Sequence, residues 1–178
     1  HWGYPTSYET DAMIENARAA FADFFNSSSD EVVFGQNMTT LTLHLARALG
    51  RQFREGDEIV VTELDHHANV DTWRSLEKER GIVIRVLPMD TESGQLETNE
   101  LPRLLNERTK LVAIGAASNA IGTINDIAAV CKLAREAGAL SFVDAVHFAP
   151  HALIDVKAIG CDFLSCSAYK FYGPHIGI

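Results

Sequence analysis

The 178-residue sequence lacks any long hydrophobic run, and it is poor in cysteine and in cationic side chains. No segment approaches the roughly 18 consecutive apolar residues of a membrane-spanning helix, so we expect no membrane partner. The formal net charge is −9, because 24 Asp and Glu outnumber 15 Lys and Arg. Nucleic acids and anionic lipids repel a net anion, so nucleic acid is not an expected partner either.

The three cysteines, Cys131, Cys161 and Cys166, have neither the even number of a disulfide framework nor the spacing of a metal site. We interpret them as free thiols in a reducing compartment, and we expect the protein in the cytoplasm. Hydrophobic residues make up 47% and charged residues 22% of the chain. This balance is typical of a soluble globular domain.

Short apolar segments alternate with segments of helical periodicity along the chain. We expect helices over residues 8–25, 39–49, 70–80, 97–106 and 126–137. We expect strands over residues 31–34, 58–61, 82–87, 111–114, 140–143 and 162–165. Apolar strands that alternate with helices indicate a mostly parallel sheet with helices on both faces. The predicted fold class is therefore α/β, with three layers (α/β/α), in one domain over residues 1–178.

Polar residues follow the predicted strands at the points where the strands end. In chain order they are Thr39 and Thr40, residues 65–67, Ser118 and Asn119, Asp144 and His147, and Ser167 and Lys170. Ligands of parallel sheets bind beyond the carboxyl ends of the strands. We therefore expect these residues to meet at one rim and to form one site.

Lys170 and Asp144 together indicate a specific cofactor. A lysine amine can form a Schiff base with an aldehyde, and an aspartate at the end of a buried strand can hold a charged ring nitrogen. These are the two groups that pyridoxal 5'-phosphate (PLP) requires of a protein. Taken singly, Lys170 could be a solvated surface charge and Asp144 a turn residue or a helix N-cap.

Two further polar positions allow a functional and a structural interpretation. Thr39 and Thr40 begin a predicted helix, where hydroxyls and free N–H groups form a phosphate site, but a threonine there can simply cap the helix. Asn119 can bond a phenolic oxygen of a ligand, or it can be a turn residue before Gly122.

The pair His66 and His67 leaves a metal site open, with Asp65 or Asp71 as a further ligand. Adjacent histidines point in different directions, and no other metal-type spacing is present. We expect no metal, and a metal hydrolase built on Asp65, His66 and His67 is the weaker alternative. An imidazole at His66 can instead stack on an aromatic cofactor ring.

The motifs resemble the large-domain core of the class V aminotransferases, the fold-type I PLP enzymes that include cysteine desulfurases. The resemblance is strongest to the selenocysteine lyase/cysteine desulfurase branch, and it covers almost the whole chain. The matching segments are residues 38–40, 64–69, 118–123, 143–147 and 167–174. They occur in the order that the family shows.

The resemblance implies a role for each site residue. Lys170 would form the Schiff base, Asp144 would pair with the pyridinium nitrogen and His66 would stack on the ring. The other implied cofactor contacts are Asn119 and His147 at the phenolic oxygen, and Thr39, Thr40, Ser167 and Tyr169 at the phosphate. Tyr169 and His147 depart from the family, in which many members carry His and Gln at these positions. These departures suggest a divergent, desulfurase-like subgroup.

The predicted function is that of a PLP-dependent transferase or lyase acting on an amino acid. The resemblance implies that residues 1–178 are an incomplete PLP-binding large domain, inactive alone, of a homodimeric protein with a further C-terminal small domain. It also places the nucleophilic cysteine of a desulfurase and the carboxylate-binding arginines beyond residue 178. Desulfuration, transamination and β-elimination therefore stay open, and a non-catalytic PLP-fold binding module is the other alternative.

Overall fold

The computed structural model describes residues 3–178 and is built on a five-stranded sheet. The strand order is β2-β1-β5-β6-β7, and all neighbouring strands pair in parallel. The strands are β1 (Glu58–Thr62), β2 (Val83–Leu87), β5 (Thr109–Gly115), β6 (Leu140–Asp144) and β7 (Phe163–Ser165). The mostly parallel sheet predicted from the sequence is confirmed.

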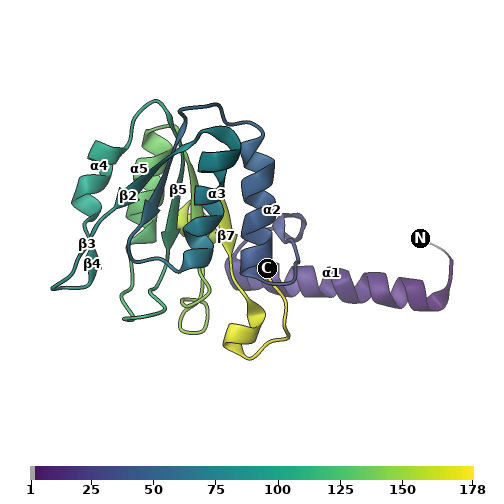
Figure 1. The fold of residues 1–178 in the computed structure, drawn as a ribbon. Coiled ribbons are helices and arrows are strands. Elements are labelled where there is room, and N and C mark those ends of the chain that lie inside the picture. The colour runs from purple at the N-terminus through teal and green to yellow at the C-terminus, as the bar shows by residue number, and fades with distance from the viewer. Residues whose placement is uncertain (1–2) are drawn as a thin grey trace.

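Helices cover both faces of the sheet (Figure 1). The longer ones are α1 (Pro5–Phe25), α2 (Met38–Gly50), α3 (Asp71–Arg80) and α5 (Ile127–Glu136). Helix α3 joins β1 to β2, and α5 joins β5 to β6 in the opposite direction along the sheet. Because such crossovers are right-handed, α3 and α5 lie on opposite faces. The predicted three layers are thus confirmed.

The core consists of the central strands and the helix faces that pack on them. Strands β1 and β5 are fully buried at Ile59–Val61 and Leu111–Ile114. Trp73 of α3 is fully buried and meets Phe142 of β6 edge to face, with ring centroids 5.4 Å apart. Each buried side chain of this size contributes about 1.5–3 kcal/mol of hydrophobic stabilisation, so this core fixes the strand ends that carry the polar residues.

Shorter elements complete the fold. They are α4 (Leu101–Leu104), α6 (Val156–Ile159), the hairpin of β3 (Met89–Asp90) and β4 (Gln95–Leu96), and 3₁₀ turns at Ser29–Glu31, His67–Asn69, Thr98–Glu100 and Ala168–Phe171. Helical structure over residues 97–106 is thus confirmed for residues 98–104, as a 3₁₀ turn followed by one turn of α-helix. It ends because the Asn106 side chain accepts the Arg108 N–H and bends the backbone into a turn.

The strand predicted over residues 31–34 is wrong. Ser29–Glu31 form a 3₁₀ turn, in which the Glu31 carboxylate accepts the Ser28 N–H at 2.8 Å. Val32 after it is extended, but residues 31–34 pair with no strand in the described part of the chain. The next residue, Gly35, forms a single isolated bridge with Gly177. A β-branched apolar run favours a strand, yet a strand forms only where a partner backbone runs alongside.

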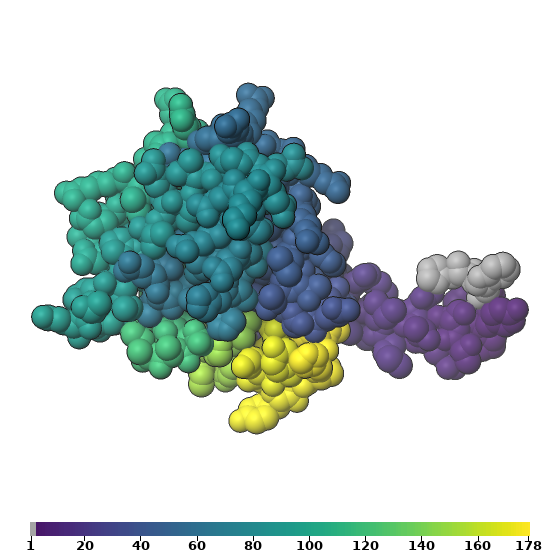
Figure 2. Space-filling model, in the orientation of Figure 1, coloured from purple at the N-terminus to yellow at the C-terminus, as the bar shows by residue number. Residues whose placement is uncertain are grey.

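Helix α1 projects from the body of the molecule (Figures 1 and 2). It begins at Pro5 and ends where Asn26 adopts a left-handed conformation, with φ of 54°. Its far half exposes Tyr8 and Met13, whereas Phe25 at its other end is buried. Among the described residues, no helix combines the length and the apolar composition needed to cross a membrane.

Candidate active site

A small cavity of about 100 Å³ lies at the rim formed by the carboxyl ends of the strands. Its lining comes from the start of α2, the loop after β1, the end of β6 and the turn after β7. The lining residues are Met38, Thr39, His66, Ala68, Asp144, Val146, His147, Ser167, Tyr169 and Lys170. The structure thus brings together polar residues from four of the five predicted positions, and the segment of Ser118 and Asn119 is not among the lining residues.

Asp144 is the last residue of β6, and it is a buried residue that lines the rim cavity. Its Oδ1 accepts the N–H of Val146 at 2.9 Å. Burial raises the pKa of Asp144 to about 6, against the lowering effects of the Val146 N–H and of the nearby His66. At neutral pH the group is therefore a carboxylate with little hydration, which strongly favours a cationic partner.

Lys170 lies in a short turn that the fold holds in place. The turn Ala168–Phe171 follows β7, and its Phe171 ring stacks on Phe24 of α1 with centroids 5.7 Å apart. The N–H of Gly173 closes the turn onto the Ala168 carbonyl at 2.9 Å, and a Cβ at Gly173 would lie only 2.8 Å from the Ala168 Cβ. The Lys170 amine is exposed and faces the rim cavity.

Backbone strain and ring stacking distinguish the residues beside Lys170. Tyr172 adopts φ of 67°, a left-handed conformation that is unusual for a side chain of this size. Tyr169 stacks on His175, with centroids 4.4 Å apart. This pair could not be predicted from the sequence, because contacts between neighbouring turns depend on how the backbone bends.

The start of α2 also lines the rim cavity, through Met38 and Thr39. The helix is capped by Asn37, whose Oδ1 accepts both the N–H (2.9 Å) and the hydroxyl (3.1 Å) of Thr40. The N–H of Met38 donates to the buried Ser167 hydroxyl at 3.0 Å. A threonine cap is therefore wrong, and Thr39, at the second position of a 13-residue helix, offers its hydroxyl to the cavity. The dipole of such a helix favours an anion at this end.

His66 begins the 3₁₀ turn His67–Asn69, and its Nδ1 accepts the Ala68 N–H at 3.0 Å. A neutral His66 therefore carries its proton on Nε2. His147 lines the same cavity, and its pKa is lowered by burial and by the positive charges of Lys170 and His66. His147 is thus uncharged at neutral pH and can accept or donate a hydrogen bond.

Two predicted site residues lie outside the lining of the rim cavity. The side chain of Thr40 borders a larger cavity on the other side of α2. Asn119 is exposed in the turn after β5, where the Ser118 hydroxyl accepts the backbone N–H groups of Ala120 and Ile121. Their contacts with a ligand stay predictions.

Asp65, His66 and His67 do not form a metal centre. The oxygens of Asp65 accept the Gly115 N–H and the Asn69 amide, both at 2.8 Å. His67 is turned to solvent, with its Nδ1 3.1 Å from Asp71. Within residues 3–178, no three His, Cys, Asp or Glu side chains gather as metal ligands would. The metal-hydrolase alternative therefore has no support in the geometry.

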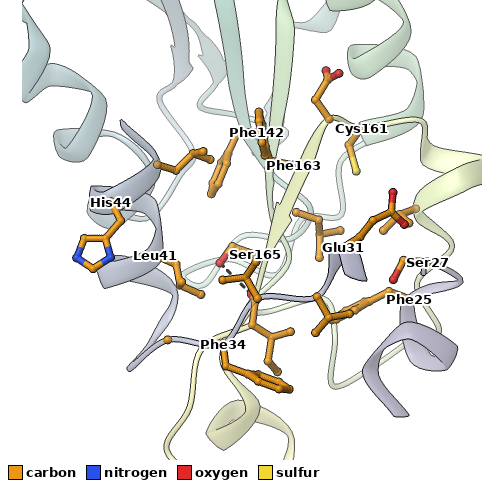
Figure 3. Close-up of a pocket in the computed structure, with 18 of the residues that line it drawn as sticks. Phe25, Ser27, Glu31, Phe34, Leu41, His44, Phe142, Cys161, Phe163 and Ser165 are labelled. Carbon is orange, nitrogen blue, oxygen red and sulfur yellow. Dashed lines mark hydrogen bonds between the residues drawn. The ribbon is translucent and has the colours of Figure 1, made fainter. Parts of the chain in front are cut away.

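The larger cavity, of about 900 Å³, is lined mainly by apolar side chains (Figure 3). It lies between α2, β7 and the end of α1, and the labelled rings of Phe25, Phe34, Phe142 and Phe163 surround it. Several of its polar groups are bonded within the chain: the Ser165 hydroxyl, for example, donates to the Ile178 carbonyl at 3.1 Å. An apolar lining of this kind is suited to packing against other apolar groups and offers few groups for catalysis.

The three cysteines are free, as predicted. Cys131 and Cys166 are buried, and burial raises the pKa of Cys131 above its usual value and that of Cys161 and Cys166 to about 12. All three thiols therefore stay protonated at neutral pH and are poor nucleophiles.

Comparison with known proteins agrees with this architecture. The family described as "Aminotransferase class-V" matches residues 4–178. A cysteine desulfurase of Dickeya dadantii is 39% identical over 177 residues, which are 98% of this chain and 43% of that protein. An aminotransferase-like protein of Gibberella zeae is 40% identical over the same length and is covered to 44%. The chain thus spans less than half the length of these relatives.

A solved structure gives the same result for the fold. The apo structure of a cysteine desulfurase from Thermococcus onnurineus NA1 superposes with a TM-score of 0.93 at 31% identity, over 99% of this chain and 44% of that one. The family match covers nearly every residue, including all five strands and the rim. The chain belongs to the class V aminotransferase family.

Proposed function

We propose that the whole protein is a PLP-dependent enzyme acting on an amino acid, as a cysteine desulfurase or selenocysteine lyase or as a class V aminotransferase. One observation carries the proposal: a single cavity contains the amine of Lys170 and the buried carboxylate of Asp144, with the start of α2 beside them. Since the chain spans 43% of its Dickeya dadantii relative, we assign it the cofactor-binding large domain of a longer protein.

The residues of the rim fit PLP group by group. Asp144 provides a poorly hydrated anion for the pyridinium nitrogen, and Lys170 provides an amine for the aldehyde. The hydroxyls of Thr39 and Ser167 and the N-terminal end of α2 suit a phosphate. The imidazole of His66 lines the cavity next to Asp144, where an aromatic ring can lie flat against it.

These residues have distinct tasks during a reaction. When bound here, PLP supplies an electron sink for bond cleavage at the substrate's α-carbon. Asp144 holds the proton on the pyridine nitrogen. Lys170 would hold the aldehyde, and its free amine could move a proton at the α-carbon. Tyr169 lies next to Lys170 at the rim and can donate its hydroxyl to phosphate, while Thr40, Asn119 and His147 stay predicted contacts of the phosphate and the phenolic oxygen.

The cysteines of this chain bear on the choice of reaction. Desulfuration needs a thiolate that attacks the substrate sulfur, and burial keeps Cys131, Cys161 and Cys166 protonated. If the protein is a desulfurase, its nucleophile lies outside residues 1–178, as do the arginines for the substrate carboxylate. Transamination and β-elimination need no such thiolate.

We further propose that the whole protein is a cytoplasmic homodimer. The projecting half of α1 supports a partner, since Tyr8 and Met13 are exposed there to 66% and 70%. Apolar side chains on a helix that leaves the body of a protein are typical of association surfaces. Sedimentation of the whole protein with and without PLP tests this, and a strict monomer that binds PLP and turns over substrate would contradict it.

The central test is chemical labelling. The whole protein is loaded with PLP and reduced with borohydride, and the modified peptide is then mapped. We expect the label on Lys170 alone. A label on Lys110, Lys132 or Lys157 with Lys170 unmodified would refute the assignment. Uptake of PLP at Lys170 without turnover of any amino acid would instead favour a binding module.

A further inference from the structure

The carboxylate of Asp65 has no task in the proposed function, yet it joins two elements of the site. Asp65 lies in the loop after β1, directly before His66. Its Oδ1 accepts the backbone N–H of Gly115 at 2.8 Å, and its Oδ2 accepts the side-chain amide of Asn69 at 2.8 Å. The two bonds lead in different directions, one to β5 and one to the far end of the turn that His66 begins.

The bond to Gly115 ties the loop to the centre of the sheet. The ladder between β1 and β5 ends at the pair Val60 and Val112, so the Asp65 carboxylate takes the place of a strand partner for the Gly115 N–H. Gly115 is also paired in register with Asp144 on β6. A Cβ at Gly115 would lie 2.8 Å from the Asp65 Oδ1, so this close approach requires a glycine.

The bond to Asn69 ties the same loop to the core. Asn69 is fully buried, and its Oδ1 accepts the indole N–H of Trp73 at 3.2 Å. Trp73 is fully buried against Phe142 of β6. Asp65 therefore links the residues on either side of His66 to the sheet and to α3.

We propose that Asp65 is a positioning residue of the cofactor site: it fixes the turn that carries His66, and thereby holds the imidazole at the rim beside Asp144. The proposal rests on the proposed function in that it assumes the ring-stacking role of His66. Inside the turn, the Ala68 N–H donates to His66 Nδ1 at 3.0 Å, so the ring orientation depends on the backbone that Asp65 holds.

Two substitutions at Asp65 remove its bonds in steps. Asp65→Ala removes both. Asp65→Asn can keep an oxygen toward the Gly115 N–H, but its amide then faces the amide of Asn69, which must turn and release Trp73. Glu63→Gln is the matched control, because Glu63 is in the same loop and also accepts a backbone N–H, that of Met89 at 3.0 Å, away from the rim.

The experiment combines a measurement without cofactor and one with it, on the whole protein. Histidine ¹⁵N spectra of the apoprotein report the tautomer of His66, and amide hydrogen exchange reports the N–H of Gly115 and Ala68. PLP affinity is measured by absorbance titration. For Asp65→Ala we expect a mixture of His66 tautomers and exchange at both amides at least about 10-fold faster. We expect PLP binding to weaken by up to about 5-fold, which is the full loss of stacking by the His66 ring. Asp65→Asn should fall between the wild type and Asp65→Ala, and Glu63→Gln should match the wild type.

The outcomes separate the two proposals. If the His66 tautomer and PLP affinity stay at wild-type values in Asp65→Ala, Asp65 has only a structural role and the positioning proposal is wrong, even if the melting temperature falls. If Asp65→Ala does not fold, Asp65→Asn and Gly115→Ala, which displaces the carboxylate from the other side, decide by the same readouts. If the wild type takes up no PLP, the proposed function fails, and the His66 spectra still decide whether Asp65 holds the turn.

Discussion

The larger of the two cavities described above is mostly apolar, whereas the smaller one is lined by polar and ionisable side chains. The larger one has a volume of about 900 Å³, and its acidic groups are bonded to the chain itself. Glu31 accepts the Ser28 N–H, and Asp162 accepts the N–H and hydroxyl of Ser141. The rim cavity, about 100 Å³, gathers a carboxylate, an amine, two imidazoles and hydroxyls around one space. Ligand chemistry in this fold follows the ends of the strands and does not follow cavity volume.

The electrostatic state of the two cavities differs as well. At the rim, burial raises the pKa of Asp144 to about 6 and lowers that of His147, which leaves an anion and a neutral imidazole at neutral pH. At the larger cavity, burial raises the pKa of Cys161 to about 12, which leaves a neutral thiol. Asp144 thus stays an anion at neutral pH despite its burial, where a cationic ligand can offset the charge, whereas the Cys161 thiol carries no charge. Substitutions in the two cavities should accordingly affect different properties.

The largest expected effect is on turnover, at the rim. Replacing Lys170 by alanine removes both the anchor of the aldehyde and the base at the α-carbon, so turnover of an amino-acid substrate should fall by about 10³-fold or more. Lys157→Ala, an exposed lysine of α6, is the control and should keep wild-type turnover. Steady-state kinetics of the PLP-loaded whole protein measure both. If the Lys170→Ala protein kept normal activity, Lys170 would not be a catalytic residue and the rim cavity would not be the active site.

The next effect concerns stability, at the larger cavity. Phe25 is buried at the end of α1, where it contacts Phe21 and Phe24. Phe25→Ala should lower the free energy of unfolding by about 3 kcal/mol, since it leaves a void in packed aromatics. PLP labelling of Lys170 should persist under native conditions. Urea unfolding measures this loss, and Tyr8→Ala on the exposed half of α1 is the control. An equal loss of unfolding free energy in Tyr8→Ala would mean that the buried packing of Phe25 does not cause the effect.

Much of this contrast could be predicted from the sequence. Apolar strands that alternate with helices define the sheet, and strand exits place His66, Asp144, His147 and Lys170 at one rim. Turn geometry could not be predicted, because it depends on side-chain bonds between distant segments. The Asp65 carboxylate was interpreted as a possible metal ligand, although it bonds Gly115, 50 positions away. One missed feature did have a signal: Asn37 stands three residues before Thr40, as a helix N-cap should.

Asp144→Asn should change affinity and stability in opposite directions. Loss of the charge-assisted bond to the pyridinium should weaken PLP binding by about 2 kcal/mol, or about 30-fold. The folded pKa of Asp144 lies above its ordinary value of 3.8, so the folded state binds this proton more tightly. Its contribution to stability is therefore largest below pH 4 and is lost as the pH rises to about 6.

Asparagine cannot ionise, so the Asp144→Asn apoprotein should lose less stability than the wild type between pH 4 and pH 6. It can also keep the bond from the Val146 N–H. Thermal unfolding of both apoproteins across this pH range, together with PLP titration at pH 7.5, measures the two effects. Parallel stability curves would show that the Asp144 carboxyl is not desolvated in the folded protein. Unchanged PLP affinity would contradict the pairing with the ring nitrogen.

The smallest effect compares two neighbouring histidines. His66 faces the rim cavity, whereas the His67 side chain is 89% exposed and 3.1 Å from Asp71. Ring stacking beyond simple burial is worth about 1 kcal/mol, so His66→Ala should weaken PLP binding about 5-fold. His67→Ala differs by one position in the same turn and should leave PLP affinity unchanged. Absorbance titration of the two variants side by side resolves a difference of this size. Equal losses would mean that the turn as a whole, and not the His66 ring, contacts the cofactor, since both substitutions affect the same backbone but only one removes a ring from the cavity.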